Sequence, residues 1–431
     1  MTKYFVDENF DSIPEVVEMT LSTFRKNKLN GDYKVDAIIS FGEPYINGHY
    51  VYQLPHYISN ALNLGGEVIT FHFSRVSDPN LIKILVSSVF TSYECSNLLC
   101  VKCEKYHWDI ELLEEARIHS YSNLNSNEVN VGISNVECKY GSTTLSKSDI
   151  LSTKSLSLEN QNLIWPIEEG FPYIPKFKDS NEVMKLVYTT FDEITSGVGD
   201  RGIIFYTYNG RDFDTFGRMK RLEKDFPNHD IVFYEGSCFG SLLALKLLET
   251  LVSDNIYDFG GYVSLSDRAR FFNRDTPLFS INYGDAIGYA RVDKSPKYLV
   301  EKISAISDSE LILKDHISYI GNRESYKLKK RFSDMESKGI IKTTQYLNSL
   351  PNKSNVKHIL PRMSPAAFEI VNKSNNFRHS TWAKHSLYPT GIFSGLNWIA
   401  EFSEVFESDD YVSVSTIGFG FSWVSALLKV V

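Results

Sequence analysis

The sequence has no excess of basic charge and no long apolar run. Its 431 residues include 45 Lys and Arg against 53 Asp and Glu, which gives a net charge of -8. Because a nucleic-acid-binding surface needs concentrated basic residues, this balance argues against nucleic acid as the main partner. No stretch is long and apolar enough to span a membrane, and the first residues lack the basic-then-apolar pattern of a signal peptide. We therefore expect a cytoplasmic protein without membrane contact.

Cysteine is scarce and scattered along the chain. An odd number of cysteines in a chain of this length does not suggest a disulfide framework, so we expect reduced thiols. Cys100 and Cys103 have the spacing of half a zinc site, but they lie in an apolar run typical of a strand, where residues three apart point to opposite faces. We expect no metal site. The five cysteines are at positions 95, 100, 103, 138 and 238.

Apolar residues are abundant enough for several domain-sized units. The hydrophobic share is 42% and the aromatic share 13%, and the chain is too long for one ordinary core. An internal repeat organises the first 270 residues or so, with the same order of helix, strand, helix, strand, helix and strand in each copy. This alternation predicts a mainly parallel sheet covered by helices on both faces. The paired helices are 14–24 and 181–191, 54–64 and 215–225, 80–89 and 241–252; the paired strands are 36–41 and 201–206, 68–73 and 230–234, 97–101 and 260–265.

Cys238 lies between the second strand and the third helix of the second copy. There the unpaired N–H groups and the positive end of the helix dipole favour a thiolate, the form that attacks acyl groups. The alternative is a small buried thiol used only for packing. In the first copy Val76 stands at the corresponding position and the turn glycines are missing, so we expect that copy to be a structural half-domain.

Four landmarks follow one another in a specific order. They are Gly236-Ser-Cys238-Phe-Gly240, Tyr283-Gly-Asp-Ala-Ile-Gly288, Leu360-Pro-Arg362-Met-Ser-Pro365 and Gly418-Phe-Gly420-Phe-Ser-Trp423. On these motifs the sequence resembles the beta-ketoacyl-ACP synthase III group of the thiolase superfamily. The resemblance implies an α/β, thiolase-like fold, layered α-β-α-β-α, of two pseudo-repeated halves.

The resemblance also implies a division of the chain. Residues 128–300 correspond to the N-terminal half of a ketosynthase III-like domain, with Cys238, and residues 301–431 to its C-terminal half. Residues 1–115 correspond to an additional, degenerate half-thiolase domain. Since members of the family dimerise through the sheet edge of the N-terminal half, the extra half-domain is expected to cover that edge and give a monomer with an internal pseudo-dimer contact.

The family uses a Cys-His-Asn triad, and the resemblance implies that two of its members are replaced. Arg362 stands at the histidine position and Ile392 at the asparagine position. Losing one donor to a developing enolate costs about two to three powers of ten in rate, so decarboxylative condensation is disfavoured. The N–H groups of Cys238 and of the turn around Gly420 correspond to the family's oxyanion donors. His385 or His358 is a candidate base, and an exposed or core histidine is the alternative for each.

Two classes of function follow. The first is a ketosynthase III-like acyltransferase, with Cys238, Gly420, Arg362 and His385 as site residues, that takes an acyl group from a CoA or acyl-carrier-protein thioester and passes it to a small acceptor in specialised metabolism. It needs no cofactor beyond that thioester substrate. The second is a non-catalytic, ketosynthase-like partner subunit of a biosynthetic complex. A third function, that of a decarboxylative 3-oxoacyl-ACP synthase, is the least favoured.

Overall fold

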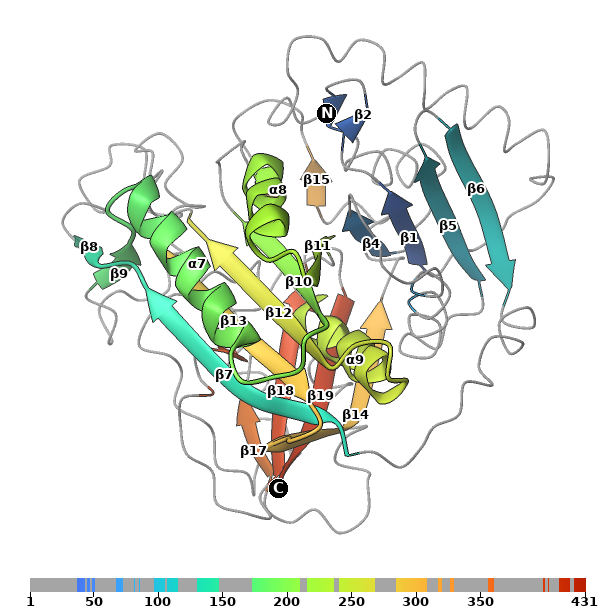
Figure 1. Ribbon diagram of the computed structural model, residues 1–431. Helices are drawn as coiled ribbons and strands as arrows, with labels where there is room; N and C mark the ends of the chain where they lie inside the picture. Colours follow the sequence, from blue (N-terminus) through green and yellow to red (C-terminus); the bar gives the residue numbers. More distant parts are fainter. Residues whose placement is uncertain are drawn as a thin grey trace.

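A computed structural model of the chain describes one large sheet and the helices that cover its middle part (Figure 1). The structure describes some of the residues of the chain. These are residues 37–42, 45–46, 49–50, 67–72, 81, 85, 97–104, 107–114, 130–146, 173–209, 215–235, 240–267, 284–307, 317–319, 326–328, 356–359, 398–399, 402, 411–418 and 422–431.

The large sheet has 13 described strands in the order β17-β18-β19-β14-β7-β13-β12-β10-β11-β4-β1-β5-β6. Three two-stranded ribbons, β2-β3, β8-β9 and β15-β16, lie outside it. The elements are β1 (Ala37–Gly42), β2 (Tyr45–Ile46), β3 (His49–Tyr50), β4 (Glu67–His72), β5 (Asn97–Glu104), β6 (His107–Glu114), β7 (Gly132–Tyr140), β8 (Thr143–Ser146), β9 (Tyr173–Lys176), α7 (Ser180–Thr195), β10 (Gly202–Asn209), α8 (Thr215–Asp225), β11 (His229–Glu235), α9 (Gly240–Ser253), β12 (Phe259–Ser266), β13 (Ala286–Asp293), β14 (Tyr298–Ser307), β15 (Ile317–Tyr319), β16 (Tyr326–Leu328), β17 (Val356–Ile359), β18 (Tyr411–Gly418) and β19 (Ser422–Val430).

The strand pairing repeats along the sheet. In the middle, β10 is parallel to both β11 and β12, and β13 runs antiparallel beside β12. Strands β1, β4, β5 and β6 have the same relations, with β1 parallel to β4 and β5, and β6 antiparallel to β5. At the other end β17 is parallel to β18, and β19 is antiparallel to β18. The predicted strands of both copies are therefore found, and in corresponding places.

The prediction of a mainly parallel sheet is confirmed for the six strands of the repeat, which form four parallel pairs and one antiparallel pair. It is wrong for the large sheet as a whole, because antiparallel pairs outnumber parallel ones among its described strands. The pairs β5-β6 and β18-β19 explain part of the difference, because only residues 105–106 or 419–421 separate their strands, and a parallel connection needs a dozen or more residues. Strands β6 and β14 are among those that the repeat does not predict.

Two antiparallel contacts join the repeated parts of the sheet. Strand β14 meets β7 at Tyr298 opposite Ile133. Strand β11 meets β4 at three residue pairs, which involve residues 233–235 of β11 and 70–72 of β4. The β11-β4 pair occupies the outer strand of the group formed by β10 to β13 (Figure 1). The internal pseudo-dimer contact stays a prediction.

Helices cover both faces of the middle of the sheet. Helix α7 begins at the Asp179 cap, whose carboxylate accepts the backbone N–H of Glu182 at 2.9 Å, and it buries one apolar stripe. Its buried residues pack with α8 and one sheet face in what we call the outer core. Helix α9 is buried on almost every side within the inner core of the opposite face. The outer core includes Val183, Val187, Phe191, Ile194, Tyr206, Met219 and Leu222.

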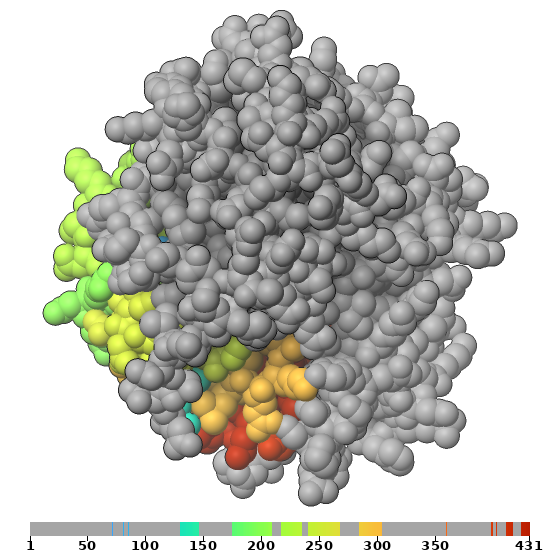
Figure 2. All heavy atoms as spheres, turned by 90° about the vertical axis from the view of Figure 1, so that its right-hand side faces the viewer, coloured from blue at the N-terminus to red at the C-terminus, as the bar shows by residue number. Residues whose placement is uncertain are grey.

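The inner core draws on distant parts of the chain. Phe71, Leu81 and Leu85 join α9 there, together with Trp398, Ile399 and several residues of β18 and β19. The orange and red residues of β14 and the C-terminal strands reach the surface beside one another (Figure 2). Within the described part of the chain, the helices are too short or too polar to cross a membrane.

The start of β11 provides a pH-dependent element of stability. The Nδ1 atom of His229 accepts the backbone N–H of Gly202 at 3.2 Å, and burial lowers the pKa of His229 below its ordinary value. The folded state therefore binds fewer protons than the unfolded state in this range, and stability falls as the pH drops through the histidine pKa. We expect thermal melting to show a lower Tm at pH 5 than at pH 7, and a smaller decrease in His229→Gln. An equal decrease in both proteins would contradict this role.

Candidate active site

The structure describes the elements on both sides of the predicted cysteine turn. Cys238, Gly420, Arg362 and His385 lie outside the described residues, as does Ile392. Strand β11 ends at Glu235, two residues before the Ser237-Cys238 dipeptide, and α9 begins at Gly240. Thus the sequence reading of a strand, a short connection and a helix is confirmed around Cys238, whereas the positions of the predicted site residues stay predictions.

The sheet topology brings three strand ends to one edge. Because β11 and β12 are both parallel to β10, the carboxyl ends of these three strands lie at the same edge of the sheet. The chain leaves β11 at this edge and returns as α9, with its N-terminal backbone N–H groups at the start of the helix. Ligand and catalytic sites in parallel sheets occur at such edges. The segment that contains Cys238 connects two elements with this geometry.

Tyr234 holds the first residue of α9. Its hydroxyl donates to the carbonyl oxygen of Gly240 at 2.9 Å, and the Tyr234 side chain is only 1% exposed. Burial, with nearby Tyr262 as a smaller cause, raises the pKa of Tyr234 well above its ordinary value. The hydroxyl therefore keeps its proton and donates throughout the physiological range. Its partner Gly240 is two residues from Cys238 in the sequence.

A glycine fits closely at the start of α9. A Cβ atom at Gly240 would lie 3.0 Å from the Tyr234 hydroxyl oxygen and 3.2 Å from Cε1 of the same ring. Such contacts are tighter than ordinary van der Waals distances, so a larger residue would force the ring or the helix to move. The close approach of Tyr234 explains why glycine is suitable at the end of the Gly236–Gly240 motif.

A second contact reaches the first turn of α9 from the C-terminal part of the chain. The indole Nε1 of Trp398 donates to the Ser241 hydroxyl at 3.1 Å. Both side chains are 1% exposed, and the Trp398 ring meets Phe402 edge-on at 5.6 Å between centroids. Sequence reasoning missed Tyr234, Ser241 and Trp398, and only the Cys238 motif itself pointed toward this region.

The Gly-Asp segment of the family resemblance has a structural role here. Asp285 is fully buried, and its carboxylate accepts the backbone N–H of Phe177 at 2.9 Å. The Asp285 backbone N–H donates to the carbonyl of Pro175 at 2.7 Å, and its carbonyl accepts from Gly141 at 3.0 Å. Asp285 therefore ties β13 to the segment that leads into α7.

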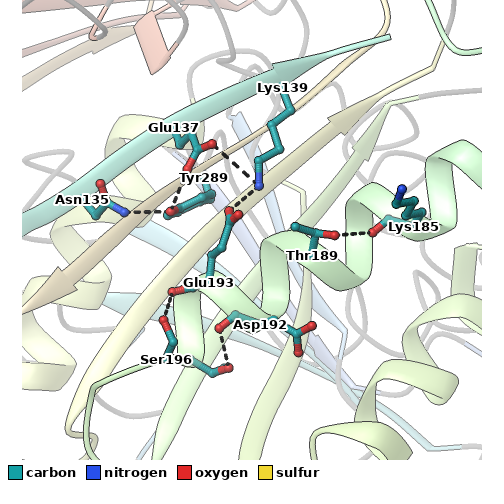
Figure 3. Close-up of polar contacts among 10 residues, drawn as sticks. Asn135, Glu137, Lys139, Lys185, Thr189, Asp192, Glu193, Ser196 and Tyr289 are labelled. Carbon is teal, nitrogen blue, oxygen red and sulfur yellow. Dashed lines mark hydrogen bonds and ion pairs between the residues drawn. The ribbon is translucent and has the colours of Figure 1, made fainter. Parts of the chain in front are cut away.

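One of the polar contacts in Figure 3 joins α7 to the sheet. Lys139 on β7 bonds to Glu193 on α7 and lies 3.7 Å from a Glu137 oxygen. The Tyr289 hydroxyl accepts from Asn135 Nδ2 at 2.7 Å and donates to Glu137 at 3.3 Å. Burial and, secondarily, Glu137 raise the pKa of Tyr289, so the hydroxyl stays protonated. Since Tyr289 belongs to the outer core, this network lies on the face opposite α9.

Cys138 differs chemically from the predicted nucleophile. It lies on β7, and burial raises the pKa of its thiol to about 12. At pH 8 only about one molecule in ten thousand would carry the thiolate. We expect peptide-level mass spectrometry to find Cys138 almost unmodified by iodoacetamide in the folded protein at pH 8, and modified rapidly in urea. Equal rates in the two states would contradict the protected environment.

The overall fold is similar to that of solved ketosynthase III-type proteins. A variant of OleA from Xanthomonas campestris matches with a TM-score of 0.53 and 11% identity, over 70% of this chain and 98% of its own. A 3-oxoacyl-(acyl-carrier-protein) synthase III matches with a TM-score of 0.53 and 11% identity, over 70% and 99%. The priming beta-ketosynthase of the R1128 polyketide pathway matches with a TM-score of 0.55 and 13% identity, over 69% and 96%. The expected thiolase-like fold is confirmed.

The comparisons based on sequence give a different result. No family model matches the chain, and no curated protein matches it. The structural matches extend over nearly the whole of the solved proteins but leave about three-tenths of this chain uncovered. The span 128–431 assigned to one family monomer is also about seven-tenths of the sequence, although the domain boundaries themselves stay a prediction.

Proposed function

We propose that the protein is an acyltransferase in which Cys238 carries the acyl group as a thioester. The observation that carries this proposal is the strand-to-helix connection that holds Cys238, with α9 beginning two residues later at Gly240. A thiol beside a helix N-terminus has a lowered pKa and a larger thiolate fraction at neutral pH. Two separate contacts, from Tyr234 and Trp398, hold the first turn of that helix.

The transfer takes place in two steps. The Cys238 thiolate attacks the carbonyl carbon of an acyl-CoA or acyl-carrier-protein thioester, and the donor thiolate leaves as the acyl-cysteine bond forms. A small nucleophile then attacks the acyl-cysteine, which releases the thiolate of Cys238. The N–H groups of Cys238 and of the Gly420 turn stabilise the oxyanion in each step. His385 is the proposed base for the acceptor, and no cofactor takes part.

Arg362 and Ile392 make transfer a better proposal than condensation. An isoleucine side chain donates no hydrogen bond to an enolate, and an arginine stays protonated and is a poor proton shuttle. Arg362 can still stabilise a negative oxygen. OleA, a synthase III and a priming ketosynthase have the same fold, which supports acyl-thioester chemistry without identifying the acyl group.

Incubation with a panel of acyl-CoA and acyl-carrier-protein thioesters tests this function. Intact-protein mass spectrometry should show one acyl group added per chain with at least one donor, and addition of malonyl thioester should yield no condensation product. A condensation product would instead assign synthase activity. No mass gain with any donor would favour the non-catalytic partner subunit, to which the replaced triad residues also point.

We also propose that the protein is a monomer. The antiparallel pair of β11 and β4 occupies the edge of the middle strands within one chain, and an edge that is already paired does not offer its backbone groups to a second copy. Size-exclusion chromatography with light scattering should give a mass near 49.2 kDa. A stable dimer that persists on dilution would contradict the proposal.

A further inference from the structure

An aromatic cluster connects the N-terminal part of the chain to the start of α9. Phe71 on β4 lies directly opposite Tyr234 on β11 in the strand register. The ring centroids of Phe71 and Tyr234 are 5.2 Å apart, and Phe205 completes the cluster at 5.7 Å from Phe71 and 5.4 Å from Tyr234. All three side chains are buried, at 1% exposure or less. The Phe71 ring thus packs against one side of the Tyr234 ring.

Tyr234 is fixed at its backbone as well as at its hydroxyl. The Thr207 hydroxyl donates to the Tyr234 carbonyl at 2.7 Å, and the Tyr234 hydroxyl donates to the Gly240 carbonyl at 2.9 Å. The ring therefore spans from β11 to the first residue of α9 and bridges the connection that contains Cys238. Its orientation is set by the rings packed against it, one of which belongs to β4.

We propose that Phe71 is a positioning residue for Cys238, acting through the Tyr234 ring and the Gly240 carbonyl. The inference rests on the proposed role of Cys238 as the acyl-carrying thiol. The N-terminal part of the chain then contributes to the site as well as to the fold, because Phe71 on β4 packs against the Tyr234 ring and keeps its hydroxyl at the start of α9. Leu81 and Leu85, buried in the same inner core, hold the adjoining N-terminal segment against that region.

The physical reason is the short range of the helix N-terminal effect. The stabilisation of an anion by a helix terminus falls off within the first turn, and a displacement of about 1 Å in a reacting group can cost a large factor in rate. A smaller side chain at position 71 leaves the Tyr234 ring free to turn away from Gly240. The first residue of α9 then loses the hydrogen bond that holds it. Because the thiolate of a cysteine beside a helix N-terminus depends on the nearby N–H groups, we expect the pKa of the Cys238 thiol to rise.

Three variants test the proposal. Phe71→Leu replaces the ring that packs against Tyr234 with a smaller side chain. Tyr234→Phe keeps the ring at position 234 but removes the hydrogen bond to Gly240. Phe191→Leu is the matched control. Phe191 is equally buried, and its ring centroid lies 6.0 Å from that of Tyr206 and 5.4 Å from that of Phe226. Unlike Phe71, it lies in the outer core. For each variant the Tm is measured, together with the pH dependence of iodoacetamide labelling of the peptide that contains Cys238.

We expect the two leucine variants to lower the Tm to a similar extent. Only Phe71→Leu and Tyr234→Phe should slow Cys238 labelling at pH 6.5, by about 5- to 10-fold, through a rise of up to about one unit in the thiol pKa. A Cys238 pH profile in Tyr234→Phe or Phe71→Leu that equals the wild-type profile would overturn the proposal. If Phe71→Leu does not fold, Phe71→Met is measured in its place, because it keeps more of the side-chain volume while removing the ring that packs against Tyr234.

The labelling readout separates this proposal from the proposed function. Labelling requires only a reactive thiol, whereas acyl loading requires a donor that fits the site. Wild-type protein that accepts no acyl group but shows the expected labelling differences would refute the acyltransferase function and leave the positioning role of Phe71 intact. Acyl loading that is equal in wild type and Phe71→Leu, with unchanged labelling, would refute the positioning role alone.

Discussion

Replacing Cys238 with alanine is expected to remove acyl loading completely, with at least a thousand-fold loss of any transfer activity. The second step of the proposed transfer starts from the acyl-cysteine, so no other residue can provide the intermediate. The fold should be retained, because a small residue replaces another in a short connection. The measurement is the initial rate of acyl transfer, together with the intact mass after incubation with the best thioester donor.

Cys138→Ala is the matched control for that substitution. Burial raises the pKa of the Cys138 thiol to about 12, so it is no nucleophile at neutral pH and its loss should change the rate of transfer less than two-fold. Transfer activity that survives in Cys238→Ala, or that disappears in Cys138→Ala at an unchanged Tm, would contradict the assignment of the nucleophile.

Replacing Trp398 with alanine is expected to give the largest loss of stability. The side chain is 1% exposed and packs in the inner core against Phe402. Truncating a buried aromatic residue costs about 3–5 kcal/mol in the free energy of unfolding, and the Ser241 hydroxyl also loses its donor. Urea unfolding followed by circular dichroism measures the loss.

Trp398→Phe separates packing from hydrogen bonding. Phenylalanine keeps an aromatic ring in the inner core but has no N–H to donate to Ser241, so we expect a loss of about 1–2 kcal/mol. The first turn of α9 would then lose the bond from Trp398 and keep the bond from Tyr234, and the rate of Cys238 labelling at pH 6.5 should fall. If Trp398→Phe lost as much unfolding free energy as Trp398→Ala, the phenylalanine ring would not pack in the space left by the indole.

Much of the fold was predictable because local patterns repeat. Corresponding apolar segments are strands in both copies, for example Ala37–Gly42 in the first copy and Gly202–Asn209 in the second, and α8 has the predicted bounds. The direction of the pairing was not predictable in the same way. The sequence between Phe259–Ser266 and Ala286–Asp293 does not show whether the chain returns antiparallel, since this depends on which neighbour the next strand finds in the sheet.

The candidate site was predictable only where its chemistry lies in one segment. The turn around Cys238 is a local pattern, and the strand and helix beside it are confirmed. The bond from Trp398 to Ser241 joins residues 157 positions apart, and the pairing of Phe71 with Tyr234 depends on how two sheet edges meet. Neither contact leaves a periodic signal in the sequence, because tertiary packing alone creates it.

The location of the acyl group tests the central claim most directly. After the protein is incubated with an accepted thioester donor, proteolysis and tandem mass spectrometry identify the modified residue. We predict a single thioester-linked acyl group on Cys238 that hydroxylamine removes. An acyl group on another residue, or an unmodified Cys238 peptide in protein that turns over the donor, would contradict the account.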